Sequence, residues 1–399
     1  MSESAAGNEA VSLLAGWMWF AASVIGNAEF WVILVNRSHA LPIAHRRLKL
    51  LRRLHDLAVP LWPLLLLWLN GLQQGSLLRG GSLWQQSLWT RRLVLFTSFW
   101  CLTLILQVLH WQFRQKRQAR ECTASRLYDV KAETKDSAVA GVPGLLAAVW
   151  PGNQYCQLDV NLKQIAIRTS RQRAEQPPQT LRILHFSDLH FTGTPGLSYY
   201  EFLVQQAELQ AADLIVFTGD LVDKPELLPE AVRILQPLTR IAPCLFVLGN
   251  HDWRYDYEQI RQQLVESGWR SVAGTAMLLR IRDRMVLIGG SERPWMSDEP
   301  PQVRESFSDL TVLLSHSPDQ LRRAEQLGYD LMLSGHTHGG QVILPLIGPV
   351  FSPSRYGVAL AAGLFQQQSP VLHVTRGVGA KDPVRWNCSP ELTLLEVSF

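Results

Sequence analysis

Three long apolar segments stand out in the first third of the chain. Val11–Val35 contains one charged residue, Leu93–Trp111 contains none, and the shorter Leu57–Leu72 lies between them. A run of about 20 predominantly apolar residues is long enough to cross a bilayer as a helix. The pattern predicts an N-terminal helical transmembrane region at residues 1–120 with about three spans. The alternative is that these segments are buried helices of a soluble bundle.

The basic residues that flank these segments predict their orientation. Lys and Arg are concentrated at positions 37–53 and 114–120, whereas the loop between the second and third segments holds few. Because loops rich in Lys and Arg stay in the cytoplasm, we expect a multi-pass protein of the inner membrane. Its N-terminus would lie outside and everything after residue 113 in the cytoplasm. The second segment is short, so a re-entrant loop is the alternative there.

Short apolar runs alternate with helical patterns from residue 181 to the C-terminus. The predicted strands are Leu181–Phe186, Leu214–Thr218, Cys244–Leu248, Met277–Ile281, Met285–Ile288, Thr311–Leu314, Leu331–Leu333, Val371–Thr375 and Leu392–Val397. The predicted helices are Tyr199–Ala211, Pro225–Leu238, Asp256–Ser267 and Pro318–Leu327. This alternation predicts an α/β fold. We expect a folded domain at residues 155–399, joined to the membrane region by a linker at 121–154.

Charge and cysteine content argue against a nucleic-acid-binding protein and against a disulfide-bonded one. Residues 1–120 hold thirteen Lys and Arg against four acidic residues, so the remainder, with 25 against 30, is acidic. A nucleic-acid-binding domain concentrates basic residues on the surface that binds, so we expect no nucleic acid partner. The five cysteines are scattered without a CxxC pair, which indicates reduced thiols rather than a disulfide framework.

Candidate site residues, most of them possible metal ligands, follow the predicted strands. In chain order they are Asp188 and His190, then Asp220 and Asp223, then Asn250 and His251, then His316, and last His336 and His338. Strand ends share one edge of a sheet, so we expect these side chains to converge. Asp, Asn and His suit Mn, Fe or Zn. Each short motif alone is compatible with an ordinary turn, and the ordered set is what predicts a site, large enough for two ions that share a carboxylate.

The ordered motifs resemble those of the calcineurin-like metallophosphoesterase superfamily. The pattern D-x-H, GD-x-x-D, GNH-D/E, a single H and GH-x-H occurs in this order between residues 188 and 338. The stretch GHTHGGQ at 335–341, followed by SPSRYG at 352–357 and TRGVG at 375–379, is similar to the YkuE/YaeI-type membrane-associated bacterial branch. The resemblance implies a four-layer α/β/β/α sandwich that covers roughly residues 158–399.

The resemblance also implies a role for each motif residue. One ion would be held by Asp188, His190, Asp220 and His338, and a second by Asp220, Asn250, His316 and His336. His251 would act beside the phosphate as an imidazolium, with Asp223 orienting it and keeping it charged. Two divalent ions (Mn, Fe, Zn or Mg) would activate a bridging water for direct hydrolysis.

These expectations describe a membrane-anchored phosphoesterase that cleaves a phosphodiester or pyrophosphate bond. Some relatives of the branch hydrolyse UDP-diacylglucosamine, so a lipid-linked substrate and membrane lipids are the expected partners. The alternatives are a soluble phosphodiester substrate and a non-catalytic membrane scaffold. Arg355, Arg376 and Arg385 lie in C-terminal loops and are candidates for a contact with substrate phosphate. Trp295 is a candidate for lining a pocket, with core packing as the alternative.

Overall fold

The computed structural model describes residues 2–43, 45–70, 75–167, 179–296, 299–303, 308–366, 368 and 370–399. The side chains of residues 2–7, 45, 70 and 116–121 lie outside this description, as do the last two residues of the predicted segment Leu57–Leu72. The chain forms two compact units, residues 1–113 and 114–399, and each is described by itself.

The first unit is helical. Its long helices are α1 (Ser2–His39), α2 (His45–Asn70) and α3 (Leu88–Glu121), and two short 3₁₀ turns at Leu77–Arg79 and Leu83–Gln85 precede α3. Among the described residues, the stretches Asn8–His39 and Leu88–Gln115 are long and apolar enough to cross a bilayer. Helix α2, the second predicted span, does not meet the same criterion, because basic residues fill its first half.

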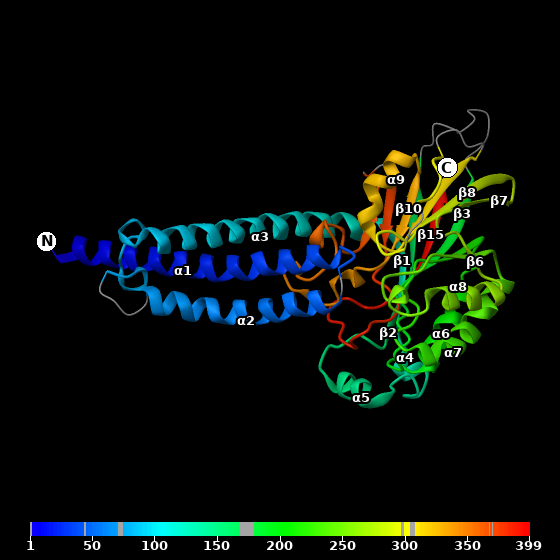
Figure 1. Cartoon of the computed structure of the whole chain (residues 1–399), viewed down its shortest axis with the longest axis horizontal. Helices are drawn as coiled ribbons and strands as arrows, with labels where there is room; N and C mark the ends of the chain where they lie inside the picture. Colours follow the sequence, from blue (N-terminus) through cyan, green and yellow to red (C-terminus); the bar gives the residue numbers. More distant parts are fainter. Residues whose placement is uncertain are drawn as a thin grey trace. The chain divides into compact units, whose positions relative to one another are not determined.

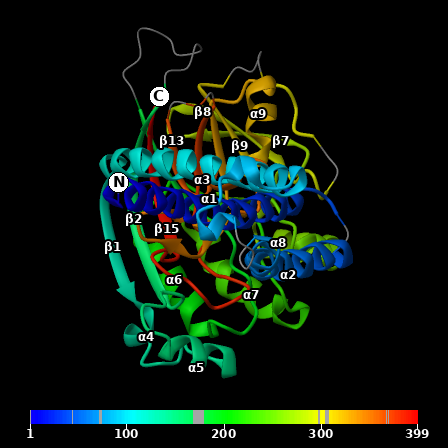
Figure 2. The same ribbon diagram turned by 90° about the vertical axis from the view of Figure 1, so that its left-hand side faces the viewer.

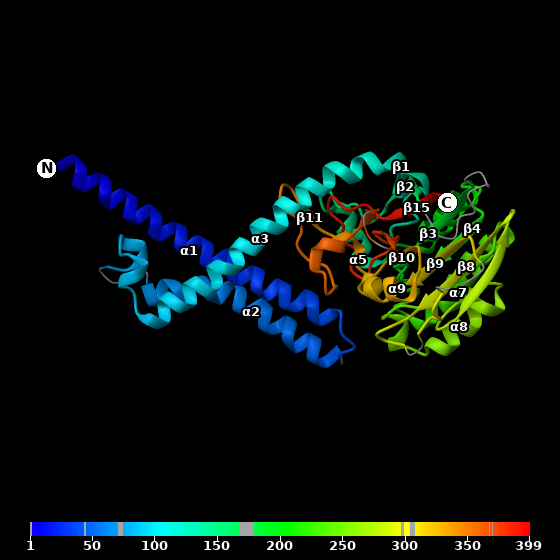
Figure 3. The ribbon, with the colours of Figure 1, turned by 90° about the horizontal axis from the view of Figure 1, so that it is seen from above.

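Polar side chains of α1 face its neighbouring helices. Asn27 donates a hydrogen bond to the carbonyl oxygen of Ala58 in α2, at 3.3 Å. The amide of Gln107 in α3 donates to the buried carboxylate of Glu29 at 2.5 Å. Helices α1 and α3 cross (Figure 3), and a Cβ at Gly26 would meet the carbonyl oxygen of Thr97. Small residues permit such close helix approach, and partnered polar groups reduce the cost of placing them in an apolar region.

The second unit contains two large sheets. The seven-stranded sheet runs in the order β1 (Cys122–Asp129), β2 (Gln157–Ala166), β15 (Glu391–Ser398), β3 (Thr180–Phe186), β4 (Leu214–Phe217), β5 (Cys244–Phe246) and β6 (Arg270–Ser271). The six-stranded sheet runs in the order β13 (Gly363–Phe365), β14 (Val371–Val374), β10 (Leu331–Ser334), β9 (Leu310–Ser315), β8 (Arg284–Ser291) and β7 (Ala276–Ile281). A small ribbon pairs β11 (Ile343–Leu344) with β12 (Gly348–Pro349).

Successive side chains of each strand point to opposite faces of its sheet, so the core consists of separate layers. Ile183 and Val216 of one sheet and Val312 and Leu314 of the other share one apolar cluster between the sheets. The opposite faces carry α6 (Leu197–Glu208), α7 (Leu228–Leu235) and α8 (Tyr257–Glu266) on the seven-stranded sheet, and α9 (Leu321–Leu327) on the six-stranded sheet (Figure 1). This is the expected four-layer α/β/β/α sandwich, and all nine predicted strands are present.

Residues 121–154 differ from the expected linker. They hold β1, α4 (Val130–Glu133) and α5 (Gly141–Val149), and β1 pairs antiparallel with β2 at the edge of the seven-stranded sheet (Figure 2). Val130 and Ala138 are fully buried in the core under α6. The alternation was not visible in the sequence because β1 is an edge strand whose side chains are mostly exposed.

The apolar layer between the two sheets predicts which leucine side chains contribute most to stability. Leu314 is fully buried there, immediately before the segment that carries His316. We expect Leu314→Ala to lower the free energy of unfolding by about 2–5 kcal/mol, because a buried leucine leaves a cavity when truncated. Denaturation of the full chain, followed by tryptophan fluorescence, measures the loss. Leu278→Ala on β7, where the leucine is 49% exposed, is the control, and an equal loss in both variants would contradict the layered core.

Candidate metal centre

The ends of five parallel strands bring the predicted site residues to one rim. The segments after β3, β4 and β5 carry Asp188 to His190, Asp220 to Asp223, and Asn250 to His251, and those after β9 and β10 carry His316 and His336 to His338. Among the described residues, side chains from this set form three groups able to hold a metal ion. The convergence follows from the topology, because both sheets present the carboxyl ends of their central parallel strands on the same side.

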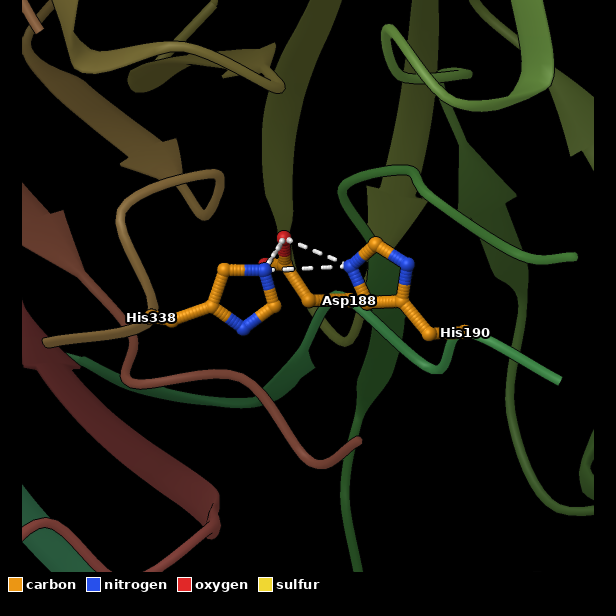
Figure 4. A group of neighbouring side chains, drawn as sticks. All are labelled: Asp188, His190 and His338. Carbon is orange, nitrogen blue, oxygen red and sulfur yellow. Dashed lines mark hydrogen bonds and ion pairs between the residues drawn. The ribbon is translucent and has the colours of Figure 1, made fainter. Parts of the chain in front are cut away.

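The first group contains Asp188, His190 and His338 (Figure 4). The Nε2 atoms of the two histidines lie 3.1 Å apart. Asp188 Oδ1 lies 3.3 Å from Nε2 of His338 and 3.8 Å from Nε2 of His190. Ligands bound at about 2.0–2.2 Å from a common cation lie roughly 3–3.5 Å apart, so these separations fit a metal site with little adjustment.

The second group contains Asp220, His316 and His336, and Asn250 adjoins it. His316 Nε2 lies 3.1 Å from both Asn250 Oδ1 and His336 Nδ1. It also lies 3.3 Å from Asp220 Oδ2. The same Asp220 oxygen is 3.6 Å from His190 Nε2 in the first group. One carboxylate oxygen therefore lies between two sets of ligand atoms.

The hydrogen bonds of the imidazoles show that the atoms facing each other are acceptors. The Nδ1 atom of His316 donates to the carbonyl oxygen of Thr218 at 2.7 Å, and that of His190 donates to Asp223 Oδ2 at 2.7 Å. In each neutral ring the Nε2 lone pair is then directed at the Asp220 carboxylate. Facing lone pairs repel one another unless a cation lies between them, so the residues fit a metal.

The buried carboxylates also raise the pKa values of two histidines in the site. Burial alone would lower the pKa of His190, but the neighbouring carboxylates of Asp188 and Asp223 raise this pKa to about 10. Burial likewise opposes the protonation of His316, but Asp220 raises its pKa to about 9. The buried carboxylates therefore attract positive charge strongly, as a proton or as a metal ion.

Asp223 connects the first group to His251. Its Oδ1 atom accepts from His251 Nδ1 at 2.5 Å, while its Oδ2 atom accepts from His190. Burial would raise the pKa of Asp223, but these two histidines hold it well below its usual range. Burial lowers the pKa of His251 in spite of Asp220 and Asp223. Asp223 thus forms hydrogen bonds to both His251 and His190 and fixes the position of each ring.

Backbone strain is concentrated at the candidate ligands. The φ angles are positive at Asp188 (56°), His190 (46°), Asp220 (61°), His336 (73°) and His338 (53°). Residues other than glycine rarely adopt this left-handed region, and each instance costs of order 1–3 kcal/mol. Such conformations persist where the surrounding structure holds them and are typical of functional sites. They turn the chain sharply after each strand, which directs the side chains into the rim.

Two glycines leave space for the carboxylates. A Cβ at Gly335 would lie 2.1 Å from Ser187 Oγ and 2.3 Å from Asp188 Oδ2. A Cβ at Gly249 would lie 2.2 Å from Asp220 Oδ1. Both positions therefore require glycine because the carboxylate of a candidate ligand, Asp188 or Asp220, approaches the backbone there.

Two further residues, Asp252 and Arg385, support the loops of the site. The carboxylate of Asp252 accepts hydrogen bonds from the backbone N–H groups of Asp220, Leu221 and Gly249, which joins two of the loops. Arg385 is fully buried and donates to the carbonyl oxygen of His338 at 3.2 Å. Arg385 therefore supports the His338 turn and is not accessible to substrate. A motif search could not find it, because its partner is a backbone atom far away in the chain.

Other candidates have structural partners. Arg376 pairs with Glu391 and Asp159, which compensates its charge. Trp295 is buried, with its ring centroid 5.0 Å from that of His336, so it covers one side of the second group. The histidines of β3 and β14, His185 and His373, are buried and hydrogen-bonded to each other, as expected for core residues.

Comparison with known proteins agrees with this geometry. Residues 181–340 match the calcineurin-like phosphoesterase family. Phosphodiesterase YaeI of Escherichia coli (strain K12) is 32% identical over 224 residues, which cover 54% of this chain and 82% of that protein. The chain belongs to the calcineurin-like metallophosphoesterase superfamily.

Further relatives define the branch of this metallophosphoesterase. The uncharacterized metallophosphoesterase YkuE of Bacillus subtilis (strain 168) is 30% identical over 222 residues, covering 53% of this chain and 77% of that protein. The UDP-2,3-diacylglucosamine pyrophosphatase LpxG of Chlamydia trachomatis serovar D is 24% identical over 278 residues, covering 55% of this chain and 84% of that protein. The chain is a metal-dependent phosphoric ester hydrolase of the YkuE/YaeI-type branch.

The close approach at Gly335 generates a prediction. Gly335→Ala places a methyl group against Asp188, so the carboxylate must move away from His190 and His338. We expect metal affinity to fall about 10–100-fold, the range seen when the support of a ligand is removed. Metal content after dialysis, together with circular dichroism to verify folding, measures the effect. A folded variant that retains its metal at the wild-type level would contradict the assigned role of Asp188.

Proposed function

We propose that this protein is a membrane-anchored binuclear phosphoesterase that hydrolyses a phosphodiester or pyrophosphate bond. The position of Asp220 Oδ2, 3.6 Å from His190 Nε2 and 3.3 Å from His316 Nε2, carries the proposal. One ion would be bound by Asp188, His190, Asp220 and His338, and the other by Asp220, Asn250, His316 and His336. Asp220 would be the shared ligand.

The chemistry needs charge at the phosphate and an activated water. Two divalent ions such as Mn, Fe, Zn or Mg supply both, because they neutralise phosphate oxygens and lower the pKa of water. The residues of the chain provide the geometry. Asp223 fixes His190 through Nδ1, and the backbone N–H of His251 donates to Asp220 Oδ1 at 2.7 Å. These bonds hold the carboxylate and the imidazole before substrate arrives, which avoids reorganisation during the reaction.

His251 is the residue proposed to act directly on the substrate. Its Nδ1 atom is bonded to Asp223, which leaves Nε2 for a phosphate or leaving-group oxygen. Burial favours the neutral imidazole. An anionic phosphate beside the ring would raise its pKa, so that protonation accompanies substrate binding. The proton at Nε2 would then pass to the departing oxygen.

The membrane anchor is proposed from the first unit. Helices α1 and α3 qualify as spans and run in the same direction, so the chain must return between them. Helix α2 lies between them in the sequence and runs in the opposite direction (Figure 1), and it is therefore the proposed third span. The basic residues at the start of α2 favour a cytoplasmic position for that end and hence for the catalytic unit of an inner-membrane protein.

Helix α5 favours a lipid-linked over a soluble substrate. It exposes Val142, Leu145, Leu146 and Val149 on one face, followed by Trp150, with exposed fractions of 60–77%. This spacing makes an apolar stripe, and amphipathic helices with a terminal Trp lie in the membrane interface. A membrane-facing α5 would bring the catalytic unit to a substrate dissolved in the bilayer. The activity in the name of LpxG makes UDP-diacylglucosamine the substrate to test first.

The metal assignment is tested with bis(p-nitrophenyl) phosphate. We expect the full chain to hydrolyse it, to lose activity with a chelator and to regain activity with Mn²⁺. His251→Ala should retain both ions and lose about 10²–10⁴-fold in kcat, the usual contribution of general acid catalysis. Asp220→Ala should lose metal as well as activity, because two sets of ligands share this carboxylate.

Metal analysis of the same variants separates the alternatives. Retention of two ions by Asp220→Ala would show that Asp220 is not the shared ligand. If the wild-type protein bound metal but turned over neither this ester nor UDP-diacylglucosamine, the non-catalytic scaffold would be favoured.

The membrane role of α5 is tested by introducing charge. We expect the double variant Leu146→Glu/Val149→Glu to lose about tenfold or more in kcat/KM toward UDP-diacylglucosamine in mixed micelles, because two apolar side chains leave the interface. Its activity on bis(p-nitrophenyl) phosphate should stay within about twofold. Leu209→Glu, at a leucine that is 72% exposed after α6, is the matched control. Equal losses on both substrates would contradict a lipid-facing role.

A further inference from the structure

One cavity of the second unit is lined by residues that adjoin two segments of the candidate metal centre in the sequence. It has a volume of about 680 Å³ and is lined chiefly by Arg293, Glu299, Asp319, Arg322, Arg323 and Arg355. Two of the residues that line it are close in the sequence to residues of the metal centre. Pro294 lines the cavity and precedes Trp295, whose ring lies against His336, and Asp319 follows His316 by three residues. The volume is within the range of small-molecule sites, about 300–1,000 Å³.

The cavity carries an excess of positive charge. Four arginines line it against two acidic residues, Glu299 and Asp319. Glu299 is engaged by Arg323, at 2.5 and 2.6 Å, and by Arg293 at 3.3 Å. Asp319 accepts from Ser354 Oγ at 2.6 Å and from the backbone N–H of Arg355 at 3.0 Å. The acidic groups therefore fix the walls in place, and the excess charge belongs to the remaining guanidinium groups.

Two arginines are available to a ligand. The side chains of Arg322 and Arg355 are exposed, and in the described part of the chain no carboxylate lies within ion-pairing distance of either guanidinium. Arg322 does hydrogen-bond to Tyr356, which also lines the cavity. The bond from Asp319 to the backbone of Arg355 holds this arginine at the rim. Of the three arginines that were candidates for a contact with substrate phosphate, Arg355 is the one whose side chain is exposed, since Arg385 is buried and Arg376 is paired with Glu391 and Asp159.

We propose that this cavity binds a second phosphate group of the substrate, next to the one that is cleaved. The inference rests on the proposed function and narrows it to pyrophosphate-linked substrates. A pyrophosphate places an additional anionic group one bond away from the reacting phosphorus. A planar guanidinium group can bind two phosphate oxygens at once, and the positive charges of Arg322 and Arg355 match the charge of such a group. A substrate with one phosphate would leave the cavity unused.

The experiment compares ligands that differ by one phosphate group. Binding of UMP and of the non-hydrolysable uridine 5′-(α,β-methylene)diphosphate to the metal-loaded full chain is measured by calorimetry. We expect the diphosphonate to bind at least tenfold more tightly to the wild type, and this advantage to disappear in Arg322→Gln/Arg355→Gln. UMP should bind the variant as it binds the wild type. Arg280→Gln, at an exposed arginine on β7, is the control for the loss of an arginine outside the cavity and should retain the advantage.

Kinetics on the same proteins give a second readout. Toward UDP-diacylglucosamine the double variant should show a KM raised at least tenfold with kcat within about twofold, and its hydrolysis of bis(p-nitrophenyl) phosphate should be unchanged. Loss of activity on the single-phosphate ester would overturn the assignment, as would an undiminished preference for the diphosphonate.

Two further outcomes separate this inference from its alternatives. Retention of the diphosphonate preference with weaker binding of the double variant to phosphatidylglycerol vesicles would identify a lipid headgroup as the occupant and overturn the proposal. The protein could instead prefer the diphosphonate to UMP in an arginine-dependent way, yet hydrolyse neither bis(p-nitrophenyl) phosphate nor UDP-diacylglucosamine. That result would support phosphate binding in the cavity and refute the proposed hydrolysis, so the two claims can fail separately.

Discussion

The buried carboxylate of Asp220 is the constraint on which the rest of the site depends. It is almost fully buried, and burial alone would raise its pKa, yet His316 and His251 hold that pKa well below the usual range. A charge in such a place must be compensated on every side. Asp220 Oδ1 accepts from the backbone of His251, and Oδ2 lies between His190 and His316. The surrounding loops are arranged to satisfy this one group, and cations complete the compensation.

The backbone of the rim follows from the same constraint. A side chain can reach a common point from a strand end only if the chain reverses direction there, and the positive φ angles of Asp188, Asp220 and His336 provide that reversal. These conformations cost energy, which the sheets offset because their inner faces form a continuous buried layer. The stability of the sheets therefore permits the strained backbone conformations of the loops.

Much of the site could be predicted from the sequence because its ligands follow strand ends in order. Such positions are recognised by an apolar run followed by Asp, Asn or His, and the topology then brings them together. The supporting role of Arg385 was missed because most of its partners are backbone carbonyl groups, which leave no pattern of side chains to recognise. Strand β1 was missed for a related reason, since an exposed edge strand lacks strict alternation. Periodicity thus reveals buried elements and motif residues, and it misses partners whose contacts depend on the folded backbone.

The metal centre and the arginine cavity differ in how the fold holds them. The candidate ligands follow the central strands of both sheets, whereas Arg322 lies at the start of α9 and Arg355 on the loop that Asp319 anchors. Residues at strand ends are fixed by the core, so the chemistry of phosphate ester hydrolysis can remain constant across the superfamily. Loops and helix surfaces tolerate substitution without loss of the fold. A change of substrate therefore requires change only outside the sheets, and the arginine cavity is lined by residues of loops and a helix rather than of strands.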